Sequence, residues 1–124
     1  MGTRSTIAIQ NPDGTITGVY CHWDGYVDHN GRILHKNYDT EDKVLALIEL
    51  GNISQLCVTT DSTIAYARDR GEYDQAAESS ASWSTFIKDH GEEYNYIFVV
   101  GEGWYVDSMN TIAPLSRLLE KEVA

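Results

Sequence analysis

A short segment near the start of the chain concentrates side chains that could bind a ligand or move a proton. It reads YCHWDGY at residues 20–26 and continues with HNG at residues 29–31. An imidazole can act as a base, an indole can stack on a planar ring, and an amide can pair with the edge of a base or a ribose. Such groups at a strand end, held by a rigid scaffold, are typical of a binding site. We therefore take as candidate ligand-binding residues His22, Trp23, Asp24, Tyr26 and Asn30.

A second candidate feature is the pair of arginines in the segment at residues 65–72. If Arg68 and Arg70 lie on an extended strand, their side chains project from the same face. Two neighbouring guanidinium groups suit a phosphate or a carboxylate. Arg4, just before the first predicted strand, can join the same ligand-binding pocket. The alternative is that both arginines form surface ion pairs with nearby acidic residues, which are Asp69, Glu72 and Asp74.

The aromatic residues offer stacking surfaces for a planar ligand. The chain has eight Tyr and three Trp but only two Phe, so most of its rings carry a polar tip. Trp23 and Trp104 come at predicted strand ends, and we take both as candidates for stacking on the ligand. Burial of Trp104 behind the last helix is the alternative, and Trp83 has the helical spacing of a core residue.

Metal binding and hydrolysis are weaker interpretations of the same segment. The chain has no HExxH and no CxxC pattern, so we predict no metal and no other cofactor. His22 and Asp24 would share one face of a strand, which suits a base held by a carboxylate. The chain has no GxSxG motif and no phosphate-binding loop, so we assign no catalytic residue and keep a hydrolase as an alternative.

The composition excludes some classes of partner. The 124 residues carry a formal charge of −10 with a pI near 4.6, which argues against broad binding to nucleic acid or to an anionic membrane. A hydrophobic fraction of 42% is ordinary for a globular protein, so we expect one domain over residues 1–124. The N-terminal sequence lacks an apolar signal core, so we expect a cytoplasmic protein with reduced Cys21 and Cys57.

Hydrophobic alternation and turn residues predict the strands. Asn11-Pro12-Asp13-Gly14 separates two alternating segments and has the residue types of a hairpin turn. Gly101-Glu102-Gly103 indicates a second hairpin in the same way. We expect strands at residues 5–10, 15–23, 58–68, 94–100 and 104–107.

Apolar residues at helical spacing predict three helices, at residues 39–50, 80–90 and 111–121. The segment at residues 25–37 contains two Gly and two Asn among charged residues, and we expect a loop there. Strands that come in two hairpins separated by helices favour an antiparallel sheet. The prediction is therefore an α+β domain, with an antiparallel sheet of about five strands and about three helices packed on one face.

Several motifs resemble a family of small proteins encoded by tailed bacteriophages. They are GTRSTI at residues 2–7, VYCHWDGY at 19–26, HNG at 29–31 and RDRGE at 68–72. The similarity continues through residues 43–56 and 94–106, so it covers most of the chain. The resemblance implies a phage origin and a host bacterial cytoplasm, and it carries over no catalytic residue.

The phage context suggests a role against host defence. Several unrelated phage families of about this size trap nucleotide immune signals. We therefore expect a binding protein that sequesters such a signal without cleaving it, either a cyclic ADP-ribose isomer of Thoeris or a cyclic oligonucleotide of CBASS. We expect a homodimer or a higher homo-oligomer. The alternatives are an acidic inhibitor of a host defence protein, or a small phosphodiesterase-like hydrolase that uses His22 and Asp24.

Overall fold

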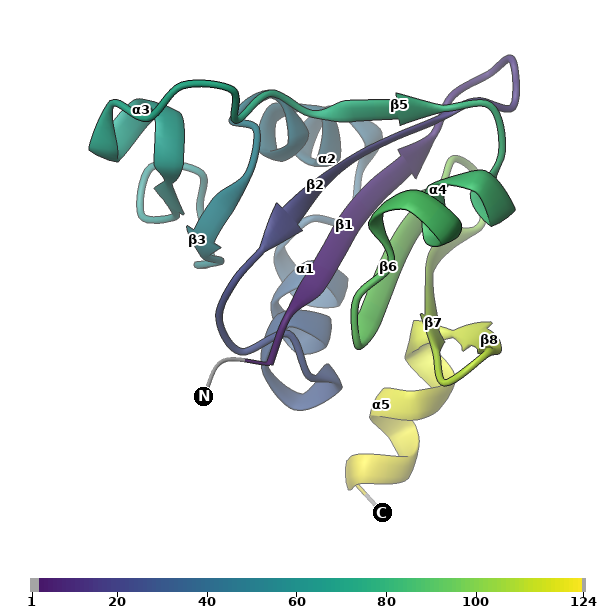
Figure 1. Ribbon diagram of the computed structural model, residues 1–124. Coiled ribbons are helices and arrows are strands. Elements are labelled where there is room, and N and C mark those ends of the chain that lie inside the picture. The colour runs from purple at the N-terminus through teal and green to yellow at the C-terminus, as the bar shows by residue number, and fades with distance from the viewer. Residues whose placement is uncertain (1–2, 124) are drawn as a thin grey trace.

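A mixed sheet of eight strands organises the part of the chain that the structure describes. The computed structural model describes residues 3–123 (Figure 1). The strand order is β4-β3-β2-β1-β6-β7-β8, and β5 pairs with β2 beside β3. The strands are β1 (Ser5–Gln10), β2 (Ile16–Cys21), β3 (Ile53–Gln55), β4 (Ile64–Ala65), β5 (Glu78–Ser80), β6 (Tyr94–Val99), β7 (Gly103–Ser108) and β8 (Thr111–Pro114).

Both predicted hairpins are confirmed. In the first hairpin, the backbone N–H of Gly14 donates to the carbonyl of Asn11 at 2.9 Å, and Gly14 adopts a φ of 89° that favours glycine. The turn sets the antiparallel register of β1 and β2, in which Ile7 lies opposite Val19. The second hairpin joins β6 and β7 through the glycine-rich turn.

The α+β class is confirmed, but the prediction of an antiparallel sheet is wrong. Strand β1 pairs in parallel with β6, and β2 pairs in parallel with β3. The two hairpins join through their first strands, which run in the same direction. A hairpin turn specifies only the pairing within its own hairpin, so the contact between hairpins depends on the helical crossovers.

The predicted strand at residues 58–68 is also wrong. Only β4 is extended, and helix α3 (Tyr66–Arg70) follows it directly. The carboxylate of Asp69 accepts a hydrogen bond at 2.7 Å from the backbone N–H of Ala65, which precedes the helix. Gly71, with a φ of 65°, ends α3 in the left-handed conformation. These local hydrogen bonds outweigh the β propensity of the segment.

Two further predictions need correction. The segment expected to be a loop forms a π-helical turn, η1 (Val27–Gly31), that continues into α1 (Arg32–Asn37). The last helix, α5 (Leu115–Val123), begins later than predicted, because β8 takes the preceding residues and pairs with β7. The first predicted helix, at residues 39–50, is confirmed as α2 (Glu41–Glu49), where the Thr40 side chain accepts from the N–H of Lys43.

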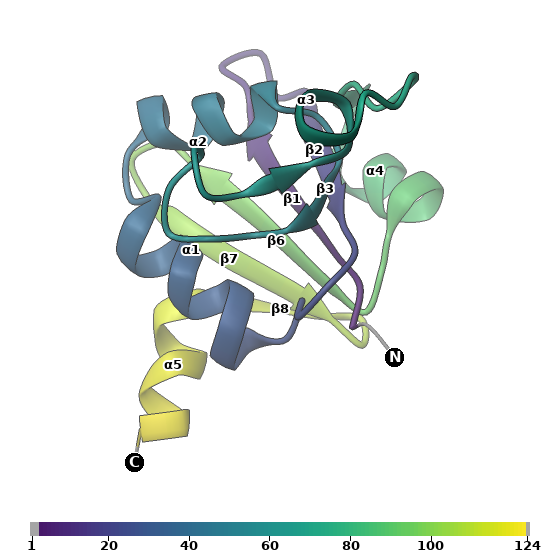
Figure 2. The same cartoon turned by 90° about the vertical axis from the view of Figure 1, so that its left-hand side faces the viewer.

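Helices cover both faces of the sheet, and not one face as predicted. Helices α1 and α2 lie behind the sheet in Figure 1, and α4 (Trp83–His90) lies in front of it. Figure 2 shows the same separation from the side. The larger core lies on the α1–α2 face and contains Ile7, Val19 and Leu47. On the opposite face, Phe86 of α4 packs directly over Gly18, where a side-chain Cβ would lie 2.6 Å from the phenyl ring.

Candidate functional site

Part of the second face of the sheet is left uncovered by α4. Val19 and Cys21 point into the larger core, so the alternating residues Tyr20 and His22 lie on the second face. In Figure 1 this region lies between α4 and α3, over the ends of β1, β2 and β3. We call it the Tyr20 face and define it by the side chains of Arg4, Tyr20, His22, Trp23, Ser54, Tyr66 and Arg70.

Strand pairing fixes the positions of Tyr20, His22 and Trp23. The backbone N–H of Tyr20 donates to Oδ1 of Asn52 at 2.9 Å. The N–H of Trp23 donates to the carbonyl of Ser54 at 3.0 Å, so β2 stays attached to β3 past its last strand residue. The Tyr20 hydroxyl lies 2.7 Å from Nδ1 of His22. The His22 and Trp23 rings meet edge to face at 4.7 Å, and Trp23 is 42% exposed.

Arg70 reaches the Tyr20 face from the end of α3. Its Nη2 lies 3.4 Å from Oγ of Ser54, which is only 3% exposed. Its Cζ lies 5.2 Å from the centre of the Tyr66 ring, within the range of a cation–π contact. These contacts orient the guanidinium without neutralising it.

Arg68 belongs to a different set of contacts. Residues two apart on a helix point in different directions, so the predicted side-by-side fork of Arg68 and Arg70 is not formed. Arg68 donates to the carbonyls of Thr60 at 2.9 Å and Thr63 at 2.6 Å, and it pairs with Asp69 at 2.9 Å. The hydrogen bond from Arg68 lowers the pKa of Asp69 below its ordinary value. The ion-pair interpretation therefore describes Arg68.

Arg4 acts on Tyr20 through its charge. Arg4 is exposed, and its carbonyl accepts a 3.4 Å hydrogen bond from the N–H of Tyr94 just before β1 begins. Burial raises the pKa of the Tyr20 hydroxyl above its ordinary value, the charge of Arg4 opposes this rise, and Glu92 and Tyr66 add to it. The Tyr20 hydroxyl therefore lies within electrostatic reach of the Arg4 cation and of the Glu92 carboxylate.

Asn30, a predicted ligand-binding residue, lies inside a buried polar network. It is 0% exposed, and its Nδ2 lies 3.2 Å from Oγ of Ser5 and 3.4 Å from Sγ of Cys21. Its Oδ1 lies 2.8 Å from Nδ1 of His29. Burial raises the pKa of the Cys21 thiol, and both cysteines are free, as expected. The amide of Asn30 thus joins β1, β2 and η1, and its hydrogen bonds are used within the protein.

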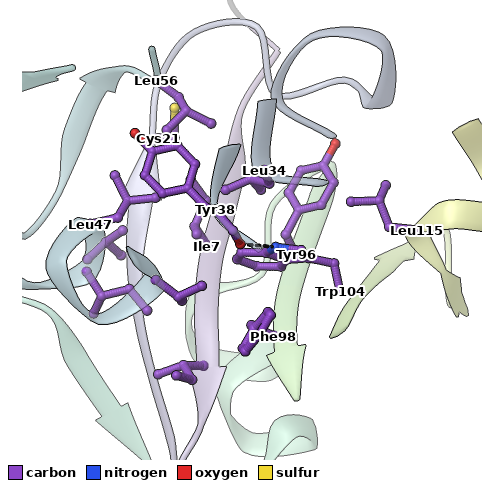
Figure 3. Close-up of a cluster of buried hydrophobic side chains, with 14 of the residues drawn as sticks. Ile7, Cys21, Leu34, Tyr38, Leu47, Leu56, Tyr96, Phe98, Trp104 and Leu115 are labelled. Atoms are coloured by element: carbon purple, nitrogen blue, oxygen red, sulfur yellow. Dashed lines mark hydrogen bonds between the residues drawn. The ribbon is translucent and has the colours of Figure 1, made fainter. Parts of the chain in front are cut away.

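The remaining predicted residues are dispersed. Trp104 is 6% exposed in the larger core, where its Nε1 donates to the carbonyl of Tyr38 at 2.8 Å (Figure 3). Burial of Trp104 was the alternative to ligand stacking in the sequence analysis. Tyr26 is exposed beside His29, with ring centres 6.1 Å apart. Asp24 adopts a φ of 55°. Its carboxylate makes no hydrogen bond to His22 within the described part of the chain, where the Tyr20 hydroxyl is the partner of the imidazole.

A pocket of about 230 Å³ adjoins the Tyr20 face, between α4 and the sheet. Tyr20 belongs to both the pocket and the Tyr20 face. The pocket is lined by Thr6, Gly18, Val19, Tyr20, Asn52, Glu78, Phe86, Asp89, His90 and Glu92.

Sequence reasoning missed Tyr20, Ser54 and Tyr66. The alternation of the second strand could have placed Tyr20 beside His22, but no local signal connects α3 with β3.

Comparison with known proteins identifies no relative: no protein-family model matches the chain, and no curated protein or solved structure matches it significantly. The resemblance to a phage family stays a prediction. Within residues 3–123, no helix combines the length and the apolar character that crossing a membrane would require. The same part of the chain contains no cluster of three or more His, Cys, Asp or Glu side chains that could hold a metal ion.

Proposed function

We propose that the protein binds a small phosphate-bearing nucleotide on the Tyr20 face and holds it without cleaving it. The observation that supports the proposal concerns the ion pairing of Arg4 and Arg70. Neither has a carboxylate partner among the described residues, although acidic residues outnumber basic ones by 19 to 9. In contrast, Arg32 pairs with Asp28, and Arg68 pairs with Asp69. An unpaired guanidinium in an acidic protein is suited to an incoming anion.

The neighbouring rings suit the rest of a nucleotide. Trp23 exposes part of its indole beside His22, and a ring of this kind stacks on a base without regard to sequence. The Tyr20 hydroxyl fixes the orientation of His22 and leaves Nε2 of the imidazole as the second hydrogen-bonding atom. The Tyr20 face therefore combines two cations, one exposed indole and one oriented imidazole.

The contacts of His22 support retention of the ligand over hydrolysis. A catalytic imidazole is usually oriented by a carboxylate that also stabilises the imidazolium. Here a phenol holds Nδ1 of His22, and the expected carboxylate of Asp24 does not. A neutral phenol stabilises an imidazolium less than a carboxylate does, so His22 is better suited to hydrogen bonding with a ligand than to general-base catalysis.

The resemblance to phage proteins narrows the class of nucleotide. A cyclic ADP-ribose isomer and a cyclic oligonucleotide both carry phosphates and planar bases, which match the two arginines and the indole. Sequestering either signal would counter a host defence. The site residues come from one chain, so a monomer supplies all of them, and a homo-oligomer would multiply the sites.

The experiment is a depletion and release assay. The protein is mixed with a cyclic ADP-ribose isomer or a cyclic dinucleotide, the free ligand is measured after filtration, and the protein is then heated. We expect depletion of one ligand class and release of the intact molecule. The Arg4→Ala, Arg70→Ala double variant should not deplete it, whereas Arg117→Ala, a matched exposed arginine, should behave like the parent. Release of a cleaved product, or depletion by the double variant, contradicts the proposal.

A further inference from the structure

The side chain of Asn52 fills a gap along the edge of β2. In the described part of the chain, no strand pairs with Tyr20 on this side, because β5 pairs with β2 only as far as Gly18 and β3 only from Cys21. Oδ1 of Asn52 accepts a 2.9 Å hydrogen bond from the backbone N–H of Tyr20. An amide side chain therefore takes the place of a strand at the residue where the Tyr20 face begins.

Asn52 also contacts both ends of the segment that carries Arg70. Its carbonyl accepts from the N–H of Tyr66, the first residue of α3, at 3.2 Å, and its N–H donates to the carbonyl of Gln75 at 2.7 Å. Its Nδ2 donates to Oε1 of Gln75 at 3.2 Å, and Nε2 of Gln75 donates to the carbonyl of Tyr73 at 3.1 Å. The two amide side chains thus form a continuous hydrogen-bonded connection from β2 to the segment after α3.

Apolar packing contributes little to the position of α3. None of its five residues is buried, and residues 67–74 are all exposed. The segment after α3 lies close to the end of α2, since a Cβ on Gly51 would lie 2.1 Å from the carbonyl oxygen of Gln75. In Figure 1, α3 lies at the edge of the molecule beside β3. Hydrogen bonds to neighbouring segments therefore determine where α3 lies.

We propose that Asn52 and Gln75 are positioning residues for nucleotide binding, because their side chains hold α3 at a fixed place relative to β2. This role rests on the nucleotide binding proposed above. Arg70 comes from α3, whereas His22 and Trp23 come just after β2, so a nucleotide that contacts both needs the two elements at one spacing. A site that is already ordered saves the free energy that the ligand would otherwise spend on ordering it.

Hydrogen exchange of the protein without ligand tests the connection itself. In Gln75→Ala, the backbone N–H of Tyr66 should exchange roughly 3- to 10-fold faster, as expected when one hydrogen bond is lost. Exchange should be faster still in Asn52→Ala, which also removes the acceptor of the Tyr20 N–H. Gln10→Ala is the matched control, because Gln10 is exposed at the last residue of β1. Unchanged exchange in both test variants overturns the role.

Calorimetric titration with cyclic ADP-ribose and with cyclic di-AMP tests the effect on binding. Gln75→Ala should weaken the binding of whichever nucleotide the parent binds by roughly 3- to 10-fold, the net value of one hydrogen bond. Residues that act through one another have non-additive effects, so the same change in an Arg70→Ala background should alter affinity by less than about 2-fold. Gln10→Ala should leave affinity unchanged in both backgrounds.

The outcomes separate this role from the proposed function. If the parent binds a nucleotide and Gln75→Ala binds it as tightly, the positioning role is overturned and nucleotide binding is not. An equal loss of affinity from Gln75→Ala in the parent and in Arg70→Ala also overturns the role, because the effect then does not pass through Arg70. If the parent binds neither nucleotide, both proposals are overturned. Circular dichroism of each variant establishes that a lost affinity does not come from unfolding.

Discussion

The hydroxyl of Tyr20 lies 2.7 Å from Nδ1 of His22 and joins the two parts of the candidate site. The charge of Arg4 acts on the Tyr20 hydroxyl, the guanidinium of Arg70 reaches the same face from α3, and Tyr20 also lines the pocket beneath α4. A ligand that used both parts would pass over Tyr20. The relationship depends on the alternation of β2, which places both side chains on the second face of the sheet.

Removal of the Tyr20 hydroxyl tests this junction. In Tyr20→Phe, His22 loses its orienting partner, so we expect nucleotide binding to weaken by about 0.5–1.5 kcal/mol, the net value of one hydrogen bond. Calorimetric titration with the nucleotide measures the effect. The control is Tyr73→Phe, because Tyr73 is 90% exposed and lies outside the site. Unchanged affinity in Tyr20→Phe would mean that the hydroxyl has no role in binding.

The two arginines of α3 should separate by phenotype. Arg70→Ala should weaken nucleotide binding by roughly 1.5–3 kcal/mol, with poor rescue by Arg70→Lys, because an ammonium does not reproduce the planar guanidinium. Arg68→Ala should leave affinity unchanged and lower the free energy of unfolding, since it removes bonds to the Thr60 and Thr63 carbonyls. Titration calorimetry and urea unfolding measure the two quantities. Lost affinity in Arg68→Ala together with lost stability in Arg70→Ala would instead place the phosphate site at Arg68.

Asn30 should matter for stability and not for binding. In Asn30→Ala, the partners of the buried amide lose their hydrogen bonds and a small cavity forms. We expect the free energy of unfolding to fall by about 2–4 kcal/mol, measured by urea denaturation. Asn37→Ala provides the comparison, because its side chain makes one bond, to the Ile33 carbonyl. A stable Asn30→Ala variant with lost nucleotide affinity would restore Asn30 as a binding residue.

The protein should lose stability in alkaline solution. Burial raises the pKa of Cys21 above its ordinary value of 9.0 and that of Tyr38 above 10.0, because it disfavours the thiolate and the phenolate. Above those values the unfolded chain releases protons that the folded chain retains, so the free energy of unfolding falls as pH rises. Urea denaturation between pH 7 and pH 10.5 measures the trend. The slope near pH 9 should be smaller in Cys21→Ala, and a flat profile in the parent would contradict the prediction.

The sequence predicted local structure better than contacts between distant segments. Alternation and turn residues were sufficient for the β1–β2 hairpin. The parallel pairing of β1 with β6 has no local signal, because it depends on how two separate hairpins meet. The helix at residues 66–70 is favoured by local contacts that β propensity does not include, such as the hydrogen bond that the Asp69 carboxylate accepts from the N–H of Ala65.

Residue types in the sequence identified only some of the side chains that form the Tyr20 face. Of the predicted binding residues, His22, Trp23, Arg4 and Arg70 lie on the Tyr20 face, and their role in binding stays a prediction. Asn30 has the same chemistry, yet it is fully buried, and a polar residue type alone does not distinguish a ligand contact from an internal hydrogen-bond network.

Mass spectrometry of the small molecules that co-purify with the protein tests whether the Tyr20 face holds a nucleotide. The parent and the Arg4→Ala, Arg70→Ala double variant are purified in parallel from bacteria that produce nucleotide immune signals, and each is denatured to release its ligand. We expect an intact nucleotide at near-stoichiometric yield from the parent and none from the folded double variant. Equal recovery from both proteins, or no nucleotide from the parent, would contradict the claim that the Tyr20 face holds such a signal.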